Sequence, residues 1–325
     1  MSILAILEQR GGAWNRLSFE ALAAAQQLGR ELGLPVAAAL VGEGAAGLAQ
    51  EAAGYALDRV WLVEHDLLAH YTAGAYTAAL AQLIQRLSPS LVLFPHTYRV
   101  RDFAPALATR FGRSMASDAI GHKIEDGHPI FVRQLFQGKL SADVRFAAAA
   151  PNFASLQAGA YRADTLEKGH APVETFAPEL DRSMIRALPG EPFRAEQRSV
   201  DLASAPLIVS VGRGIKEKDN LPIVEGLAEA LGAELAASRP ICDNGWLPME
   251  RQVGSSGQTV APKLYVAVGI SGAIQHLVGM KGARTIVAIN KDADAPIFEV
   301  ADYGIVGDLF EIVPALIEEL RKAKG

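Results

Sequence analysis

Short apolar runs alternate with longer segments of helical spacing along most of the 325-residue chain, and this rhythm is what most constrains the fold. Strand–helix–strand units of this kind predict an α/β domain built on a parallel sheet. In the first hundred residues, the expected buried strands are Ile3–Leu7, Val36–Val41, Val60–Val63 and Leu91–Pro95.

Helices are expected between these strands. The first is predicted to have Ser18 as its N-cap and to stop at Gly33-Leu34-Pro35. Residues Ala73–Leu87 are helical by composition, and a further helix is expected over Ala104–Phe111, after Arg101-Asp102.

From about residue 119 the helical spacing is lost, and a strand-rich segment is expected to complete the first domain. Its runs are Gly121–Ile124, Ile130–Phe136, Lys139–Phe146 and Phe153–Ala160. The polar, proline-containing stretch Ala163–Ala205 is the predicted connection between domains, with Val173–Phe176 and Phe193–Val200 as candidate edge strands.

The C-terminal third resumes the strand–helix alternation. The expected strands are Leu207–Val211, Glu234–Ala237, Leu264–Val268, Thr285–Ile289 and Tyr303–Val306. The expected helices are Leu221–Leu231, Ser271–Met280 and Pro314–Lys322, the last beginning at Pro314 and not at Asp308 because proline suits a first helical turn. Parallel strands of this kind form a ligand crevice beyond their carboxyl ends, where the strand order reverses.

Charge and cysteine content exclude several classes of protein. With 31 basic and 36 acidic residues the net charge is -5, which argues against a nucleic-acid partner because no basic stripe is available to neutralise phosphates. A single cysteine, Cys242, rules out an intramolecular disulfide and a thiolate metal cluster. The N-terminal apolar stretch is too short to span a bilayer and no basic segment precedes it, so we expect a cytoplasmic protein without membrane insertion.

The segment Pro262–Asp308 carries the most chemical information. A strand ends at Val268, Gly269 and Gly272 allow backbone to approach a ligand, and Ser271 is placed to cap the next helix. A helix N-terminus presents unpaired N–H groups and partial positive charge, which suits a phosphate or pyrophosphate. The pattern is not the dinucleotide fingerprint GxGxxG, so a strand–turn–helix without a ligand stays open as an alternative.

Two further polar positions follow expected strands. Asn290 follows one strand and Asp308 follows the next, so both are predicted to face the same crevice. The structural alternative for both residues is turn formation, which asparagine and aspartate favour.

The run LYVAVGISGAIQHLVGMKGARTIVAINKD, with its continuation APIFEVADYGIVGDLFEIVPALIEEL, resembles the FAD-binding motif of electron-transfer flavoprotein alpha subunits. The segments VGRGI, ASRP and GWLPMERQVGSSGQTVAP match this family in order and spacing. The specific resemblance spans about residues 207–320. The N-terminal half matches more loosely, through SFEAL and PHTYRVRDFAPALATRF.

This resemblance implies two domains. Residues 1–200 would form a nucleotide-hydrolase-like α/β domain that docks a beta subunit, and residues 201–325 would form a Rossmann-like parallel-sheet domain that binds FAD. The cofactor-binding residues that it implies are Arg213, Ser238, Arg239, Val253, Gly254, Ser255, Ser256, Gly269, Ser271, Gly272, Ala273, Ile274, Gln275, His276, Asn290, Asp308 and Leu309.

The resemblance also implies roles. Arg239 would lie beside the isoalloxazine and favour its anionic reduced and semiquinone forms, and His276 would give the pyrimidine end a hydrogen bond or a charge. The turn 271–273 and Asn290 would serve the phosphates and the ribityl–adenosine side. The structural alternatives are a surface salt bridge for Arg239 and an internally satisfied helix histidine for His276.

The sequence departs from the family pattern at two places. Ser255-Ser256 stands where many members have Gln-Thr, and Val211 stands where a glycine is common. Both changes bear on the subfamily and not on the fold.

The function that the resemblance implies is that of a non-catalytic carrier. FAD would accept electrons from a flavoprotein dehydrogenase, such as an acyl-CoA dehydrogenase of fatty acid β-oxidation, and pass them toward quinone through a separate oxidoreductase. Three alternatives stay open: an NAD-binding enzyme on the same sheet, a structural or signalling partner with a degenerate pocket, and an electron-bifurcating or nitrogen-fixation-type member. In this last type the beta subunit would hold a second flavin in place of AMP.

The remaining polar residues are expected to have structural roles. Cys242 has no nearby histidine in the sequence and is expected to be a small buried residue. Arg99, Arg101 and Asp102 are expected to form a salt bridge at a helix entry. Surface or turn positions without metal spacing are expected for His65, His70, His96, His122, His128 and His170.

Overall fold

The computed structural model describes residues 1–136, 138–187, 190 and 202–324. Contacts divide the chain into two compact units, Met1–Phe193 and Arg194–Gly325, which we treat separately. The junction expected after residue 200 and the candidate strand Phe193–Val200 both lie outside the described residues.

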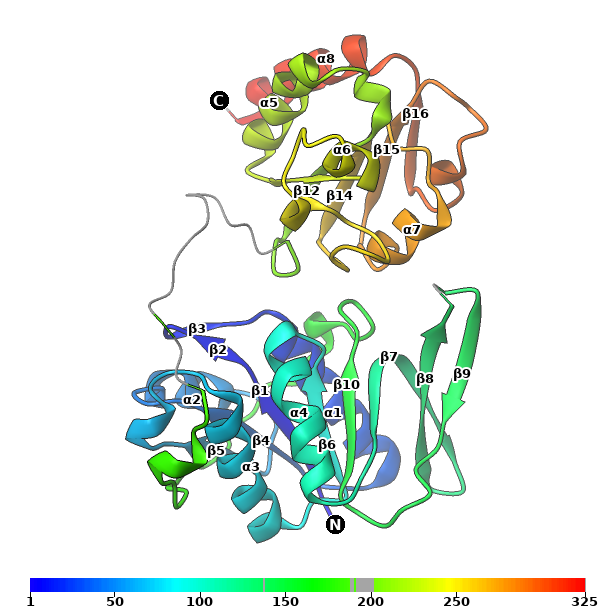
Figure 1. The fold of residues 1–325 in the computed structure, drawn as a ribbon. Helices are drawn as coiled ribbons and strands as arrows, with labels where there is room; N and C mark the ends of the chain where they lie inside the picture. Colours follow the sequence, from blue (N-terminus) through cyan, green and yellow to red (C-terminus); the bar gives the residue numbers. More distant parts are fainter. Residues whose placement is uncertain (137, 188–189, 191–201, 325) are drawn as a thin grey trace. The chain divides into compact units, whose positions relative to one another are not determined.

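The N-terminal unit is built on one nine-stranded sheet in the order β11-β5-β4-β1-β6-β10-β7-β8-β9 (Figure 1). The strands from β11 to β7 pair in parallel, and β8 and β9 extend the sheet antiparallel. The bounds are β1 Ile3–Leu7, β4 Val36–Val41, β5 Arg59–Val63, β6 Leu91–Pro95, β7 Met115–Glu125, β8 His128–Leu135, β9 Leu140–Val144, β10 Asn152–Leu156 and β11 Val173–Phe176. A short hairpin of β2 Gln9–Arg10 and β3 Ala13–Trp14 follows β1. The predicted α/β class and the strand-rich close of this unit are confirmed.

Helices cover both faces of this sheet. Helices α1 (Leu17–Leu32) and α2 (Ala46–Ala52) pack on one face, and α3 (Ala73–Leu87) and α4 (Tyr98–Arg110) pack on the other (Figure 1). Strand β1 contributes alternate side chains to the two cores, because successive residues of a strand point to opposite faces.

Two helix starts differ from the prediction. Helix α1 begins at Leu17, so Ser18 lies inside it; the Ser18 hydroxyl accepts from the Glu8 N–H at 2.7 Å and donates to the Glu8 carbonyl at 3.0 Å. Helix α4 begins before the predicted Ala104, because Thr97 caps it by accepting from the Val100 N–H at 3.1 Å. Thr97 bonds a backbone group three residues away, whereas the backbone partner of Ser18 is ten residues away, and helical periodicity shows neither contact.

The segment predicted to connect the domains belongs partly to the N-terminal unit. Strand β11 pairs in parallel with β5 at the edge of the sheet, which confirms the candidate edge strand there. Glu167 accepts an ion pair from Arg30 at 2.8 Å, and Gln26 bonds its backbone. The prediction that the connection starts at Ala163 is therefore wrong. The polar composition of this segment did not show that it adds a strand and hydrogen bonds to the N-terminal unit.

The C-terminal unit is a five-stranded parallel sheet in the order β13-β12-β14-β15-β16. Its strands are β12 Leu207–Val211, β13 Glu234–Ala237, β14 Leu264–Val268, β15 Ile286–Asn290 and β16 Tyr303–Val306. Helices α5 (Leu221–Leu231) and α8 (Leu309–Lys324) lie side by side on one face with α6 (Arg239–Asp243), and α7 (Ile274–Met280) packs on the other (Figure 1). The predicted Rossmann-like sheet is confirmed.

The last helix starts earlier than predicted. Helix α8 begins at Leu309, because the Asp308 carboxylate accepts from the Phe310 N–H at 2.9 Å and caps the first turn. Pro314 lies within the helix, where it removes one internal hydrogen bond but does not prevent the turn. The prediction that Pro314 starts the helix is wrong.

No helix among the described residues combines the length and apolarity that a bilayer crossing requires.

Candidate cofactor site

The predicted site residues of the C-terminal unit follow strands that all run in the same direction. Arg213 follows β12, Ser238 and Arg239 follow β13, and Asn290 is the last residue of β15. The carboxyl ends of parallel strands share one edge of a sheet, so the structure brings these residues to that edge. We call this edge the carboxyl edge.

The strand order reverses at the centre of this edge. From β12 the chain runs outward to β13, then returns to place β14 on the other side of β12. Loops at such a switch point diverge and leave room for a ligand above the strands. Here the two central loops are joined at their base: Gly212 N–H donates to Val268 O at 2.9 Å, and Gly214 N–H donates to Gly269 O at 3.0 Å.

The loops approach each other so closely at this base that only glycine fits there. A Cβ on Gly269, which has φ +63°, would lie 2.8 Å from the Gly214 Cα. A Cβ on Gly272, with φ +84°, would lie 2.2 Å from the Ile297 nitrogen. Both glycines were predicted to let backbone approach a ligand. The structure shows that they let loops of the protein approach one another, and ligand approach there stays a prediction.

Residues 252–258, which we call the serine loop, lie between β13 and α7. Val253 N–H donates to Ala237 O at 2.9 Å, and Ser255 N–H donates to Gln275 O at 2.7 Å. Ser255 and Ser256 are exposed, and the Ser256 hydroxyl accepts from the buried Gln252 amide at 2.9 Å. The loop is fixed at both sides while Ser255 and Ser256 stay exposed.

The turn before α7 is exposed to solvent. Ser271, Ala273 and Gln275 are exposed, and Ile274 is 57% exposed. Ser271 does not cap the helix as predicted, because α7 starts at Ile274 with Ala273 at its N-cap and no side-chain cap bond. The exposed apolar Ile274 leaves this turn open to a ligand or a partner.

Asn290 and Asp308 both make the turn contacts that were the structural alternative. The Asn290 amide donates to Ile270 O at 2.8 Å and its oxygen accepts from Asp292 N–H at 3.0 Å. Asp308 caps α8, and Leu309 is buried beside Gly269. Asn290 therefore ties the β14 loop to the β15 loop, and any contact of Asn290 with a cofactor stays a prediction.

Arg239 provides an accessible cation at the carboxyl edge. Its side chain is 67% exposed, and its Nε lies 3.1 Å from Asp243 Oδ2, one helical turn along α6. An exposed pair at this spacing contributes little free energy, so a bound anion can compete for the guanidinium. Arg213 is exposed at the end of the neighbouring strand.

His276 is the buried polar residue of the site. The ring is 6% exposed, and its Nε2 lies 2.9 Å from the Tyr265 hydroxyl. Its Nδ1 is buried without a hydrogen-bond partner among the described residues. Burial lowers the pKa of His276 to about 4, and the nearby Val253 carbonyl acts in the opposite direction. The ring is therefore neutral near pH 7, which supports a hydrogen bond to a cofactor and not the alternative of a charge.

These residues fit the FAD that the sequence implies. A buried, unpartnered imidazole nitrogen needs a partner, and a cofactor atom is a natural one. Exposed guanidinium groups and serine hydroxyls are the donors that phosphate and isoalloxazine oxygens accept from. In the described parts of the chain, no group of three or more histidine, cysteine, aspartate or glutamate side chains is arranged to hold a metal ion.

Tyr265 is a site residue that the sequence analysis missed. It lies in the middle of the apolar run of β14, where only the alternation of the strand places it on the face of α7. The same applies to Gly214 and Gly279, whose close backbone contacts have no signature in a single sequence.

Other predicted residues have structural roles. Cys242 is buried, as predicted, and burial raises the pKa of its thiol to about 11. Arg99 does not form the predicted salt bridge; it donates to Gln9 O at 2.6 Å and lies over the Tyr71 ring, whose hydroxyl donates to Asp102 at 2.6 Å. Tyr71 therefore contacts both charged side chains.

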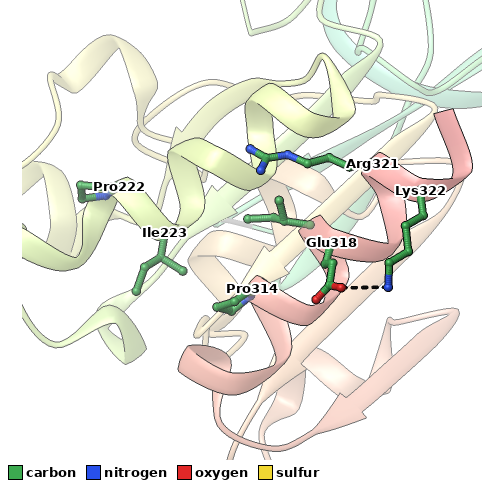
Figure 2. A pocket seen from close by; sticks show the side chains of 7 residues that line it. Pro222, Ile223, Pro314, Glu318, Arg321 and Lys322 are labelled. Carbon is green, nitrogen blue, oxygen red and sulfur yellow. Dashed lines mark ion pairs between the residues drawn. The ribbon is translucent and has the colours of Figure 1, made fainter. Parts of the chain in front are cut away.

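The hollow of ≈ 470 Å³ between α5 and α8 is separate from the site. Figure 2 shows its proline and charged lining, with Glu318 and Lys322 joined at 2.8 Å. None of its lining residues belongs to the predicted set.

Comparison with known proteins agrees with the geometry. Residues 3–181 match the family model described as "Electron transfer flavoprotein domain", and residues 201–281 match "Electron transfer flavoprotein FAD-binding domain". The chain is 40% identical to "Electron transfer flavoprotein subunit alpha" of Syntrophomonas wolfei, with 97% of this chain and 98% of that protein covered. It is 38% identical to the protein of the same name from Bacillus subtilis, covering 98% and 97%. It is 34% identical to "Protein FixB" of Clostridium saccharobutylicum, covering 97% and 95%.

Acid should weaken the C-terminal unit through His276. Between pH 6.5 and pH 4 the unfolded ring binds a proton that the folded ring, with a pKa of about 4, does not bind. The free energy of unfolding should therefore fall as pH falls through this window, by about 3 kcal/mol from this ring alone. Urea unfolding of the chain and of His276→Gln at a series of pH values measures this, and the variant should show the shallower decline. Parallel curves for the two proteins would contradict the prediction.

Gly279→Ala should push the serine loop away from α7. The added Cβ would lie 2.4 Å from the Gly254 nitrogen and 2.5 Å from its Cα, and neither backbone atom can move without the loop. We expect a loss of about 1–3 kcal/mol in the free energy of unfolding, measured in urea. Gly226→Ala in α5 is the matched control, because its Cβ would meet only the Ile317 Cδ1 at 3.5 Å, and alanine favours a helix. An equal effect of the two substitutions would refute the loop contact.

Proposed function

This chain belongs to the family of electron transfer flavoprotein alpha subunits, and from that membership we propose that it is an electron carrier without substrate chemistry of its own. FAD is its cofactor, since the C-terminal unit matches the FAD-binding domain of the family. The observation that best supports the proposal is the convergence of Arg239, the serine loop and the buried His276 at one sheet edge within this matched region.

Bound FAD supplies reversible electron uptake, and the protein residues act by binding and orientation. Arg239, permanently cationic, favours negative charge on the ring system. His276 is neutral and offers a hydrogen bond from a water-excluded position. Ser255, Ser256 and Ser271 offer hydroxyl groups from loops whose backbones are fixed by hydrogen bonds.

The proposed partners follow from the subunit name of the relatives. We propose a heterodimer with an electron-transfer flavoprotein beta subunit, for which residues 1–200 serve as the docking domain. Flavoprotein dehydrogenases such as acyl-CoA dehydrogenases of fatty acid β-oxidation would donate electrons, and a quinone-linked oxidoreductase would accept them. Both encounters would be transient and would take place in the cytoplasm.

A second candidate is an electron-bifurcating or nitrogen-fixation-type member of the same family. The replacement of Gln-Thr by Ser255-Ser256 supports this second candidate. These residues flank the proposed isoalloxazine position, and their side chains are shorter than those of Gln-Thr. The two candidates differ in the beta subunit, which would carry AMP in the first and a second FAD in the other. The NAD-binding alternative has no support from the comparisons, since the matched domain is an FAD-binding one.

Flavin content tests the proposal. The chain co-expressed with its beta subunit should purify yellow, with flavin absorbance bands and FAD equimolar to the alpha subunit. A second equivalent of FAD would indicate the bifurcating type, whereas AMP with single FAD would indicate the simple carrier. A colourless complex that takes up no added FAD would overturn the proposal.

Arg239→Ala should lower the midpoint potential of the bound flavin. Removing a cation near the ring makes electron uptake less favourable, by roughly 50–150 mV for a charge at close range. Spectroelectrochemical titration of the complex measures the shift. Arg321→Ala on α8 is the control, because that arginine lines the hollow of Figure 2 and not the carboxyl edge. Equal potentials in the wild type and Arg239→Ala would remove Arg239 from the flavin site.

A further inference from the structure

Gln252, the first residue of the serine loop, has a buried amide side chain. The residue is 1% exposed, and its backbone is fixed because Gln252 N–H donates to Met249 O at 3.0 Å and Gln258 N–H donates to Gln252 O at 2.8 Å. A Cβ on Gly257 would lie 3.0 Å from the Gln252 Cγ, so the side chain runs directly against the backbone of the loop. Glutamine is seldom buried to this extent unless a hydrogen bond holds it there.

The amide makes one hydrogen bond to a protein group. Its Nε2 donates to the Ser256 hydroxyl at 2.9 Å, whereas its Oε1 is buried without a partner among the described residues. A buried amide oxygen without a partner costs free energy, which an apolar side chain of similar length would avoid. The free energy of folding therefore does not explain a glutamine at this position, and the contact with Ser256 is the remaining reason for it.

Ser256 needs an external contact to hold its hydroxyl in one place. The residue is exposed, so core packing does not restrict its χ1 angle, and an unbranched serine has three staggered positions open to it. Threonine, which stands here in many members of the family, is restricted at χ1 because its Cβ is branched. The Gln252 amide gives the serine the restriction that branching gives a threonine.

Either end of the amide would hold the hydroxyl at the same position. A hydroxyl both donates and accepts hydrogen bonds, so the Ser256 oxygen is fixed whether Nε2 or Oε1 of Gln252 faces it. The rotamer of Ser256 thus depends on the length and polarity of the side chain at position 252 and not on the orientation of the amide.

We propose that Gln252 is a positioning residue, which fixes the Ser256 hydroxyl in a single rotamer and so holds it in place for the cofactor. Only the benefit to the cofactor rests on the proposed function, since the rotamer is a property of the chain alone. Selecting one of three staggered positions in advance strengthens binding by about a factor of three, because the ligand no longer has to order the side chain.

The rotamer can be measured in the chain without FAD. Three-bond Hα–Hβ couplings of ¹³C-labelled serine report χ1, and Ser256→Ala identifies the signals of residue 256. We expect one staggered rotamer in the wild type and averaged couplings in Gln252→Met, which keeps the length of the side chain and removes the amide. The urea midpoint of Gln252→Met should equal or exceed that of the wild type, because the unpaired oxygen is removed with the amide.

FAD titration of the flavin-depleted complex with the beta subunit tests the benefit to the cofactor. Gln252→Met should weaken FAD binding about threefold. In a Ser256→Thr background the same substitution should have no effect, because threonine restricts its own hydroxyl. Gln82→Met is the matched control, since the Gln82 amide donates to the Glu179 carbonyl in the N-terminal unit, and it should change neither the rotamer nor the affinity.

Several rotamers of Ser256 in the wild type would overturn the inference, and this measurement stands even if Gln252→Met does not fold. A single rotamer retained in Gln252→Met, or a lowered urea midpoint that gives Gln252 a structural role instead, would also overturn it. So would an equal change in FAD affinity with and without Ser256→Thr. A wild type that shows the single rotamer yet binds no FAD would instead refute the proposed function and leave the rotamer assignment intact.

Discussion

The direct contact of backbone with backbone at the carboxyl edge of the C-terminal sheet is the constraint on which the site depends. Gly214 lies against Gly269, Gly272 against Ile297, and Gly254 against Gly279, at distances where no Cβ fits between. Side-chain packing tolerates small adjustments, but two main chains in contact do not. The loops after β12, β14 and β15 and the serine loop are thereby held at fixed spacing before any ligand arrives, which reduces the cost of binding.

Burial sets the chemistry of the same edge. Arg239 stays accessible and permanently charged, whereas His276 is buried and kept neutral by its surroundings. The edge therefore offers a cation for electrostatic attraction and an uncharged donor for orientation, and the two do not compete. Asn290 and Asp308 are engaged with backbone N–H groups of the following turns, and Asn290 carries no charge.

Sequence periodicity predicted the strands well. Apolar runs of four to six residues, such as Val36–Val41 and Leu264–Val268, are typical of buried strands in an α/β chain. It failed where a single polar side chain decided an element boundary. Thr97 and Asp308 extend helices α4 and α8, and Ser18 bonds the backbone of Glu8, just after β1, instead of capping α1. The site residues were predicted from a family resemblance. Tyr265 was not predicted, because a tyrosine inside an apolar strand gives no sign that its hydroxyl meets a histidine eleven residues later.

Strand β11 has a consequence for any attempt to shorten the protein. It covers the edge of β5, and Arg59 of β5 is paired with Glu174 of β11. A fragment that stopped at residue 162, where the polar stretch begins, would strip β5 of this neighbour and leave its N–H and C=O groups unpaired beside Trp61 and Leu62. Bare edges of that kind recruit strands from other molecules. A soluble N-terminal fragment would have to extend beyond Phe176, into sequence that looks dispensable.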